Sequence, residues 1–279
     1  MVRFSIQGVS RHVRRILGNG DVCMYLVEGA GRALLVDTGY GIGDLRGFVE
    51  GLLATAEGSL KPYDVLLTHG HLDHAAGAGQ FDRCYLNPAD LGLYYQHADL
   101  AYRKEHVLGR NFTDFADLED SDWVVSGGEQ IVALEPGTRF DLGGVHVEVI
   151  AAPGHTPGMV VPVIVEDRLA MFGDACGVGT LVVEPFSSSV RTFLESIRVL
   201  KGREDAWDSV IREHGTFVST KRVLDDNIEL AERVLAGTDD AEETNFYGAT
   251  VFRAAATNQA TGTRTDGREG NLIYSRSLA

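Results

Sequence analysis

Three histidines and an aspartate lie within six consecutive residues of the stretch LLTHGHLDHAAG, residues 66–77. They are His69, His71, Asp73 and His74, in a chain that has only nine histidines. Imidazole nitrogens and a carboxylate oxygen together suit a borderline metal such as zinc. The spacing also differs from two histidines four residues apart on a helix, which bind one metal. The stretch therefore predicts a metal site rather than a solvated polar turn.

The segment before this cluster, YDVLLT, is predicted to be a buried strand, so the four residues sit on a loop at a strand end. In an extended segment, positions 69, 71 and 73 would converge on one side while His74 faces away toward a second point. Four residues do not complete two metal sites, so other ligands are required. Three later strands are each followed by a candidate beside glycine, namely His155 in APGHTPG, Asp174 in MFGDAC and His214 in IREHGT.

In this order, the motifs H-x-H-x-D-H, G-H-T-x-G, G-D and H-G resemble those of the metallo-β-lactamase-fold hydrolases, over about residues 22–215. The resemblance implies an α/β fold, a four-layered αββα sandwich with two metals between its sheets at one edge. It also implies the ligands: His69, His71 and His155 for the first metal, Asp73, His74 and His214 for the second, and Asp174 bridging both. The early stretch LLVDTG resembles the D-T-G turn of the family, where Asp37 would orient the ligands.

The function that the resemblance implies is a di-zinc hydrolase, with iron or manganese as alternative metals. Two metals about 3.5–4 Å apart can share a bridging hydroxide that is nucleophilic at neutral pH. Asp73 is expected to bind metal and also to orient the attacking water or accept its proton. The favoured substrate is a small carboxylic ester, thioester or lactone, because the chain is acidic and shows no added nucleic-acid-processing domain.

Other functions stay open. A phosphodiesterase acting on a small phosphate ester would need cationic groups facing the metals, for which Arg103 and Arg110 are the candidates. An iron-dependent sulfur dioxygenase uses overlapping motifs and would contain iron without zinc. A β-lactamase proper is less favoured because no export signal is visible. A non-catalytic binding protein of this fold would be expected to lack some of the ligands.

Composition limits the partners. The formal net charge is −15, whereas proteins that bind nucleic acids or anionic membranes usually carry a basic surface, so a small molecule is the expected partner. No apolar run approaches the roughly 20 residues of a membrane helix, and the N-terminal stretch lacks signal-peptide features.

Three scattered cysteines, Cys23, Cys84 and Cys176, imply no disulfide framework and favour the cytoplasm. A homodimer is one option for the oligomeric state.

Strands and helices alternate along the chain, which favours a layered α/β architecture in one domain covering residues 1–279. GDLRGFVEGLLATA has the apolar spacing of an amphipathic helix. DRCYLN predicts a strand, and PADLGLYYQHADL a helix with proline in its first turn.

Residues 98–130 are interpreted as an insertion or lid. Aromatic and basic residues lie in and beside this insertion: Tyr94, Tyr95, His97, Tyr102, Arg103 and His106. The favoured interpretation of this group is a packed or solvated helix face, and the alternative is a set of substrate contacts.

The second half of the chain continues the alternation. Strands are predicted at VHVEVI, MVVPVIVE, RLAMFGD and DSVI, and helices at SVRTFLESIRVL and TKRVLDDNIELAERVLAG. A final strand pair is predicted at GATVFRAAA and GNLIYSRS. The later ligand candidates therefore each follow one of the predicted strands.

Overall fold

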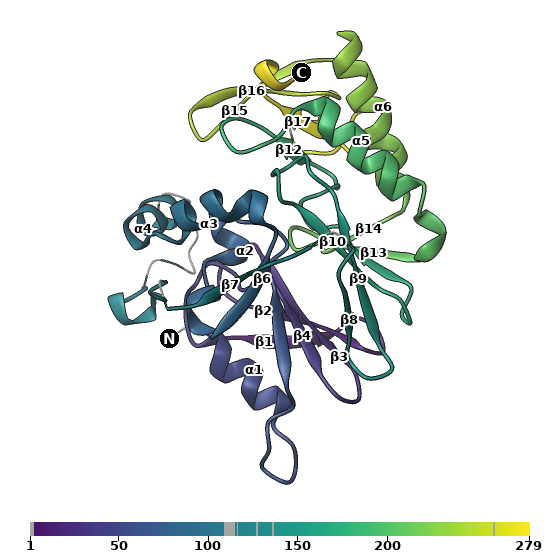
Figure 1. The fold of residues 1–279 in the computed structure, drawn as a ribbon. Helices are drawn as coiled ribbons and strands as arrows, with labels where there is room; N and C mark the ends of the chain where they lie inside the picture. Colours follow the sequence, from purple (N-terminus) through teal and green to yellow (C-terminus); the bar gives the residue numbers. More distant parts are fainter. Residues whose placement is uncertain (1–2, 109–114, 116, 127, 136, 259) are drawn as a thin grey trace. The chain divides into compact units, whose positions relative to one another are not determined.

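The computed structural model describes residues 3–108, 115, 117–126, 128–135, 137–258 and 260–279 (Figure 1). The chain divides into two compact units. Unit 1 comprises Met1–Glu148 with Glu213–Gly215, and unit 2 comprises Val149–Arg212 with Thr216–Ala279. The single domain expected from the sequence stays a prediction. Within the described ranges, none of the helices has the length and apolar character that crossing a membrane requires.

Unit 1 contains a seven-stranded sheet whose strands follow the order of the chain. They are β1 (Ser5–Gly8), β2 (Val13–Leu17), β3 (Cys23–Glu28), β4 (Ala33–Val36), β5 (Tyr63–Leu66), β6 (Arg83–Leu86) and β7 (Gln130–Ala133). Strands β1 to β4 pair antiparallel, whereas β4 to β7 pair parallel. Neighbouring parallel strands end at the same edge of a sheet, so the residues after β4 and β5 are brought together there.

The predicted amphipathic helix is α1 (Leu45–Leu53), which packs against one face of this sheet (Figure 1). Its buried face, Leu45, Val49 and Leu53, shares one apolar core with Leu35 of β4 and Val65 of β5. The spacing of its apolar residues therefore decides how the helix is attached, as expected for a helix period of 3.6 residues.

The segment after β5 differs from the prediction. α2 (Leu72–Ala75) is a single helical turn, in which the N–H of Ala75 donates to the carbonyl of His71 at 2.9 Å. The expectation that residues 69, 71 and 73 alternate along an extended segment is therefore wrong beyond His71. Ala75 and Ala76 favour the helical conformation, but four residues are too few to show a helical period.

A 3-10 turn and two helices follow β6: η2 (Pro88–Asp90), α3 (Leu91–Ala98) and α4 (Leu100–Leu108). Pro88 begins this helical segment, as predicted. The described part of the insertion also contains the short turn η4 (Asp120–Asp122). Residues 109–114, 116 and 127 of the insertion, Arg110 among them, lie outside the described residues, and its role as a lid stays a prediction.

A second sheet has the order β14-β13-β11-β10-β9-β8, and the chain passes from unit 1 to unit 2 within β9. Its strands are β8 (Arg139–Asp141), β9 (His146–Ala151), β10 (Val160–Ile164), β11 (Leu169–Met171), β13 (Ser209–Ile211) and β14 (Val218–Ser219). β11 pairs antiparallel with β10 and parallel with β13. The four strands predicted from VHVEVI, MVVPVIVE, RLAMFGD and DSVI are confirmed.

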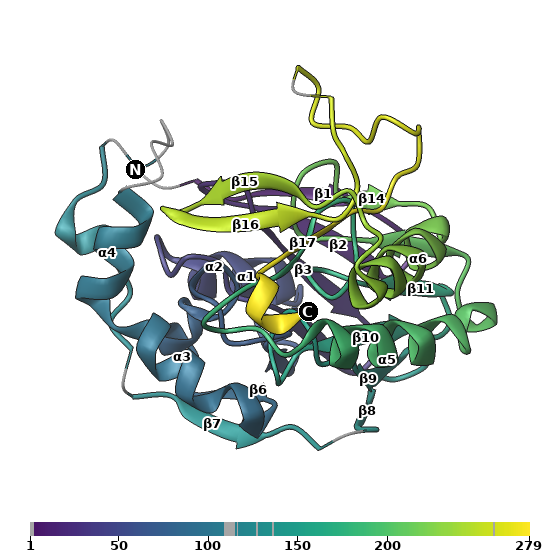
Figure 2. The same ribbon diagram turned by 90° about the horizontal axis from the view of Figure 1, so that it is seen from above.

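The two predicted helices of unit 2 are α5 (Val190–Lys201) and α6 (Arg222–Ala236), which lie side by side (Figure 2). Each buries one apolar face, which includes Phe193 and Ile197 on α5 and Leu230 on α6. These faces share the core of unit 2 with the fully buried Trp207.

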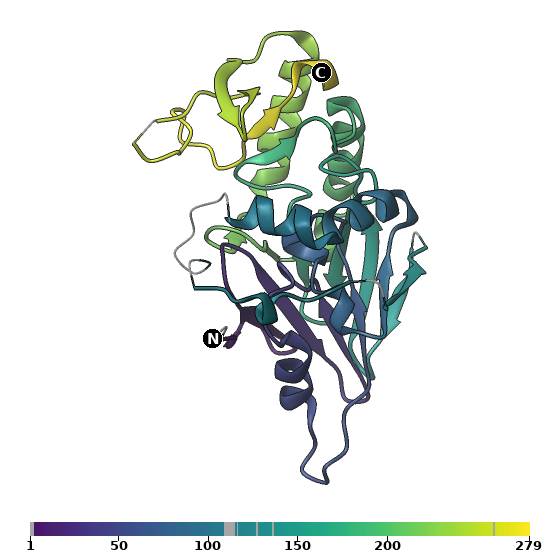
Figure 3. The same ribbon diagram turned by 90° about the vertical axis from the view of Figure 1, so that its left-hand side faces the viewer.

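Unit 2 also contains a four-stranded sheet of order β12-β17-β16-β15 (Figures 2 and 3). Its strands are β12 (Thr180–Val182), β15 (Glu242–Phe246), β16 (Ala249–Arg253) and β17 (Leu272–Tyr274). The predicted final pair, β16 with β17, is confirmed. The other two strands were not predicted, because β12 has three residues and β15 reads EETNF, which shows no alternation of apolar and polar residues.

Candidate metal centre

Asp37 is the central acceptor of the site in unit 1. It directly follows β4, and its backbone is left-handed at φ 63°, a conformation that aspartate tolerates better than most residues. The fully buried carboxylate accepts two bonds at Oδ2, from the hydroxyl of Thr68 at 2.8 Å and from Nδ1 of His74 at 2.7 Å. Its Oδ1 accepts the N–H of Thr68 at 2.7 Å. Asp37 therefore ties the end of β4 to the histidine segment.

These bonds decide which nitrogen two of the imidazoles present. His74 donates from Nδ1, so its Nε2 carries the available lone pair. The hydroxyl of Thr68 donates its only proton to Asp37. Its oxygen therefore accepts a hydrogen bond from Nδ1–H of His69 at 3.1 Å. His69 consequently also presents its Nε2.

The turn after Asp37 holds α2 in place. Both the N–H and the hydroxyl of Thr38 donate to the carbonyl of His74, at 2.6 and 3.0 Å. A Cβ at Gly77 would lie 2.3 Å from the carbonyl oxygen of Thr38, so this close approach requires glycine. The bonds to the carbonyl of His74 and the close approach at Gly77 therefore fix the C-terminal end of this short helix against Thr38.

His214 belongs to unit 1 although it is distant in sequence from the other histidines. It forms a β-bridge with Val22, and the N–H of Cys23 donates to the carbonyl of Glu213 at 2.9 Å. The Nδ1–H of His214 donates to the carbonyl of Asp21 at 3.0 Å. The lone pair of His214 that remains is again on Nε2.

The ligand atoms offered within unit 1 have the separations that a metal requires. Nε2 of His69 lies 3.0 Å from Nδ1 of His71, and Nε2 of His74 lies 3.1 Å from Nε2 of His214. Oδ2 of Asp73 is 3.6 Å from Nε2 of His214. Two nitrogens bound tetrahedrally to zinc at about 2.0–2.1 Å are about 3.3 Å apart. The donor set of unit 1 therefore fits divalent metal.

Unit 2 brings two further predicted ligands together. His155 follows β9 and Asp174 follows β11, and Nε2 of His155 lies 3.3 Å from Oδ2 of Asp174. Nδ1–H of His155 donates to the carbonyl of Leu181 at 2.8 Å, which leaves Nε2 to act as a ligand. This separation lies within the range of 3.0 to 3.6 Å found in unit 1.

The three cysteines do not supply thiolate ligands. All are buried and none is in a disulfide. Burial raises the pKa of Cys23 and of Cys84 to about 12, and it also raises the pKa of Cys176. The thiols are therefore protonated at neutral pH, and a protonated thiol is a poor nucleophile and a poor ligand.

Arg103 has a structural role. It is fully buried, and its guanidinium donates to the main-chain carbonyls of Ala98, Tyr40 and Gly41 at 3.2, 3.4 and 3.3 Å, and to that of Val124. Desolvation lowers its pKa from the ordinary value. Its N–H groups are hydrogen-bonded to main-chain carbonyls and are therefore poorly placed to bind a substrate phosphate.

Replacing Arg103 with leucine is expected to lower the free energy of unfolding by about 3 kcal/mol or more, since each buried carbonyl left without a donor costs about 1–3 kcal/mol. Urea denaturation followed by circular dichroism measures this change. The control is Arg198→Leu, whose side chain is 54% exposed in a surface ion pair with Glu232, where about 1 kcal/mol or less is expected. Similar losses in the two variants would contradict the structural role.

The remaining aromatic residues beside the insertion divide between packed and exposed. Tyr94 and His97 are buried, and the hydroxyl of Tyr94 donates to Glu129. Tyr95 is 59% exposed. The interpretation as a packed helix face therefore holds for Tyr94 and His97.

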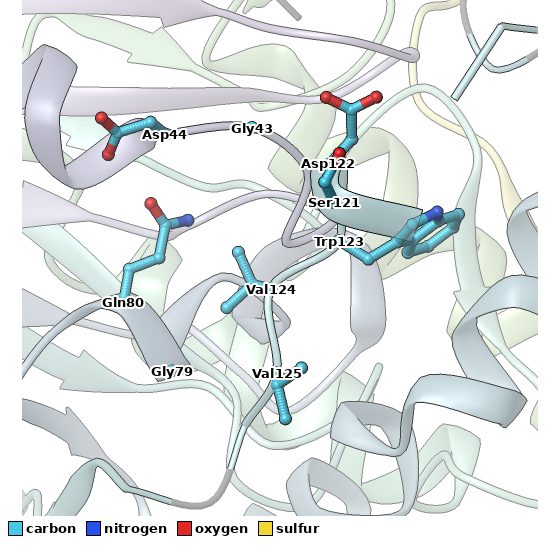
Figure 4. A pocket seen from close by; sticks show the side chains of 9 residues that line it. All are labelled: Gly43, Asp44, Gly79, Gln80, Ser121, Asp122, Trp123, Val124 and Val125. Carbon is cyan, nitrogen blue, oxygen red and sulfur yellow. The ribbon is translucent and has the colours of Figure 1, made fainter. Parts of the chain in front are cut away.

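A pocket of about 500 Å³ opens beside the start of α1 (Figure 4). Its lining is formed by Gly43, Asp44, Gly79, Gln80, Ser121, Asp122, Trp123, Val124 and Val125, none of them a predicted ligand. Asp44 accepts the N–H of Gly47 at 2.8 Å, and Asp122 accepts the N–H of Glu119 at 2.9 Å. Both carboxylates therefore serve as local caps, and this pocket is not the predicted metal site.

Sequence reasoning missed three residues that orient candidate ligands, namely Thr68, Asp21 and Leu181. Thr68 precedes the histidine cluster directly, and a hydroxyl at the strand end was a signal that could have identified it. Asp21 and Leu181 accept from His214 and His155 through main-chain carbonyls, so their residue types carry no signal.

Comparison with known proteins places these observations in a family. The family profile described as the metallo-beta-lactamase superfamily matches residues 17–207. Human acyl-coenzyme A thioesterase MBLAC2 is 26% identical over 178 residues, which are 57% of this chain and 60% of that protein. Atrochrysone carboxyl ACP thioesterase of Aspergillus fumigatus is 26% identical over 178 residues, 63% of this chain and 34% of that protein. The chain therefore spans 60% or less of the length of these two relatives.

Solved structures show the same fold. A metallo-beta-lactamase from Pontibacter korlensis aligns with a TM-score of 0.56 at 16% identity, covering 82% of this chain and 99% of that one. The predicted α/β fold of metallo-β-lactamase type is confirmed. Such a fold implies binding of divalent metal, and the histidines and aspartates described above offer donor atoms of the type that such a metal binds.

Proposed function

Because the chain belongs to the metallo-β-lactamase superfamily, we propose that it is a metal-dependent hydrolase of small thioesters, with two zinc ions as the working metals. In this proposal His69, His71 and His155 would hold one metal, Asp73, His74 and His214 would hold the other, and Asp174 would bind both. The assignment is supported by the order of the motifs and by the donor chemistry found within each unit.

The hydrogen bonds made by Nδ1 of four imidazoles support the proposal most directly. His69, His74, His155 and His214 each donate Nδ1–H to an oxygen and keep a lone pair on Nε2. Metal-binding histidines almost always have such a partner on the second nitrogen. The Nε2 atoms of His74 and His214 face each other at 3.1 Å. Two imidazole nitrogens this close require a proton or a metal cation between them.

When bound, two divalent metals would polarise the substrate carbonyl and lower the pKa of a water molecule, making it nucleophilic near neutral pH. The largely buried carboxylate of Asp73 would hold the attacking water and take up its proton. Asp37 and Thr68 hold the rings of His74 and His69, so the ligand atoms need not reorganise during turnover.

Among carboxyl compounds, thioesters are favoured over esters and lactones because two relatives are thioesterases by name. The rival reaction, hydrolysis of a small phosphodiester, was supported by Arg103 and Arg110 as cationic groups. Arg103 is buried and donates to main-chain carbonyls. The phosphodiesterase interpretation thereby loses one of its two supports.

A hydrolysis panel on the zinc-loaded protein tests the proposal. Acyl-coenzyme A and other thioesters, carboxylic esters and lactones are compared with small phosphodiesters and a β-lactam. We expect thioester turnover with two zinc ions per chain. The three cysteines are buried, so the released thiol can be measured with a thiol reagent against a low background. Turnover of phosphodiesters alone contradicts the proposal, and iron without zinc together with oxygen consumption would indicate the dioxygenase.

A further inference from the structure

α3 and the residue before it hold the main chain on both sides of His71. Oδ2 of Asp90 accepts the N–H of Gly70 at 3.0 Å, and Nδ1 of His97 accepts the N–H of Leu72 at 3.2 Å. Both acceptors are buried, Asp90 fully and His97 at 4% exposure. They are seven residues apart, about two helical turns, and therefore lie on one face of the helix.

The packing of α3 against this loop is close. A Cβ at Gly70 would lie 2.9 Å from the carbonyl oxygen of Asp90 and 3.0 Å from the main-chain nitrogen of Tyr94. The main chain of the loop thus contacts the main chain of α3 directly. A small shift of α3 would be passed on to the residue between the two hydrogen bonds.

The ring of His97 has a defined state and position. Since Nδ1 accepts from Leu72, the proton is on Nε2, which donates to the hydroxyl oxygen of Tyr102 at 3.0 Å. The His97 ring stacks on the His71 ring, with centroids 5.3 Å apart and planes at 23°. It also stacks on the ring of Tyr102, at 4.8 Å and 26°. His97 therefore contacts both the ring of His71 and the amide that follows it.

His71 depends on its main chain more than the other candidate ligands do. It offers Nδ1 toward Nε2 of His69, whereas the other four ligand histidines offer Nε2. Nδ1 is bonded to the ring carbon next to Cβ and lies close to the main chain, so side-chain rotation corrects little of a main-chain shift. We infer that His97 and Asp90 are positioning residues that direct Nδ1 of His71 at the metal. This inference rests on the proposed function, in which His71 is a ligand.

Amide hydrogen exchange on the metal-free protein tests the contact without any metal. His97→Leu removes the acceptor at similar volume, and exchange of the Leu72 amide is expected to accelerate about tenfold or more. His97→Asn restores an acceptor near the position of Nδ1, and exchange near the wild-type rate is expected. His97→Gln places its amide too far along the side chain and is expected not to rescue. The Gly70 amide, held by Asp90, is the internal control and is expected to change less.

Cobalt binding tests the consequence for the ligand. In His97→Leu, cobalt affinity measured by chelator competition is expected to fall about 10–100-fold at one site, with an altered visible spectrum, as for loss of other partners that orient ligands. His97→Asn is expected to recover both. Tyr102→Phe removes the partner of Nε2 while keeping Nδ1, and a smaller loss is expected.

The outcomes separate the inference from the proposed function. Wild-type exchange at Leu72 in His97→Leu overturns the positioning role, as does an unchanged cobalt affinity and spectrum in that variant. If wild-type protein binds no cobalt, the proposed function fails, and exchange at Leu72 still decides whether His97 holds the loop. If His97→Leu does not fold, the comparison of His97→Asn with His97→Gln decides, since equal metal affinities in these two contradict the inference.

Discussion

Replacing Asp73 with alanine is expected to reduce kcat/KM for thioester hydrolysis by about 10³-fold or more, because one side chain would lose two roles. Its carboxylate is largely buried, and Oδ2 lies 3.6 Å from Nε2 of His214, the separation expected for two ligands of one metal. In the proposed mechanism the same carboxylate accepts the proton of the attacking water. Steady-state kinetics together with metal analysis measure both effects.

A second substitution separates the two roles of Asp73. Asp73→Asn keeps an oxygen ligand but lacks the basicity of a carboxylate, so it is expected to retain more metal than Asp73→Ala and to remain slow. Asp82→Ala is the matched control, because the Asp82 side chain is 88% exposed and pairs only with Arg46 among the ion pairs described. Wild-type turnover is expected there. Retention of most of the rate in Asp73→Ala would remove Asp73 from the mechanism.

Much of the candidate site in unit 1 could be predicted from the sequence because its residue types are rare and their place in the chain is regular. Asp37 and His69 each follow a short apolar strand, and β4 and β5 are parallel neighbours, so their carboxyl ends meet. Asp174 follows a strand in the same way in unit 2. The length and the apolar spacing of α1, α5 and α6 likewise sufficed to predict them.

Other parts depend on contacts that residue types do not encode. The helical turn at Leu72–Ala75 is stabilised by the Thr38 bonds to the carbonyl of His74, which no local pattern reveals. Arg103 carries the same charge whether it faces a substrate or four main-chain carbonyls. β15 is a strand because β16 pairs with it, although its own residues are polar. In each case tertiary contacts override a weak or ambiguous local preference.

Replacing Asp37 with asparagine is expected to lower the metal affinity of the site that contains His74 about 10–100-fold and to reduce turnover by at least as much. If the new amide nitrogen takes the place of Oδ2, it donates to Nδ1 of His74, so the proton of that ring moves to Nε2 and blocks the ligand lone pair. If the amide nitrogen takes the place of Oδ1, it faces the N–H of Thr68, and two donors oppose each other in a buried position.

Both orientations of the introduced amide also lower the free energy of unfolding, by about 1–3 kcal/mol for a buried donor left without an acceptor. Metal analysis, the cobalt spectrum and urea denaturation distinguish the two, because the first orientation changes mainly the metal site and the second mainly the stability. Asp82→Asn makes the same chemical change at an exposed position and is expected to alter neither. An Asp37→Asn protein that binds two metals as tightly as the wild type would show that the buried Asp37–His74 bond does not set which nitrogen His74 presents, and the assignment of His74 as a ligand through Nε2 would have to be withdrawn.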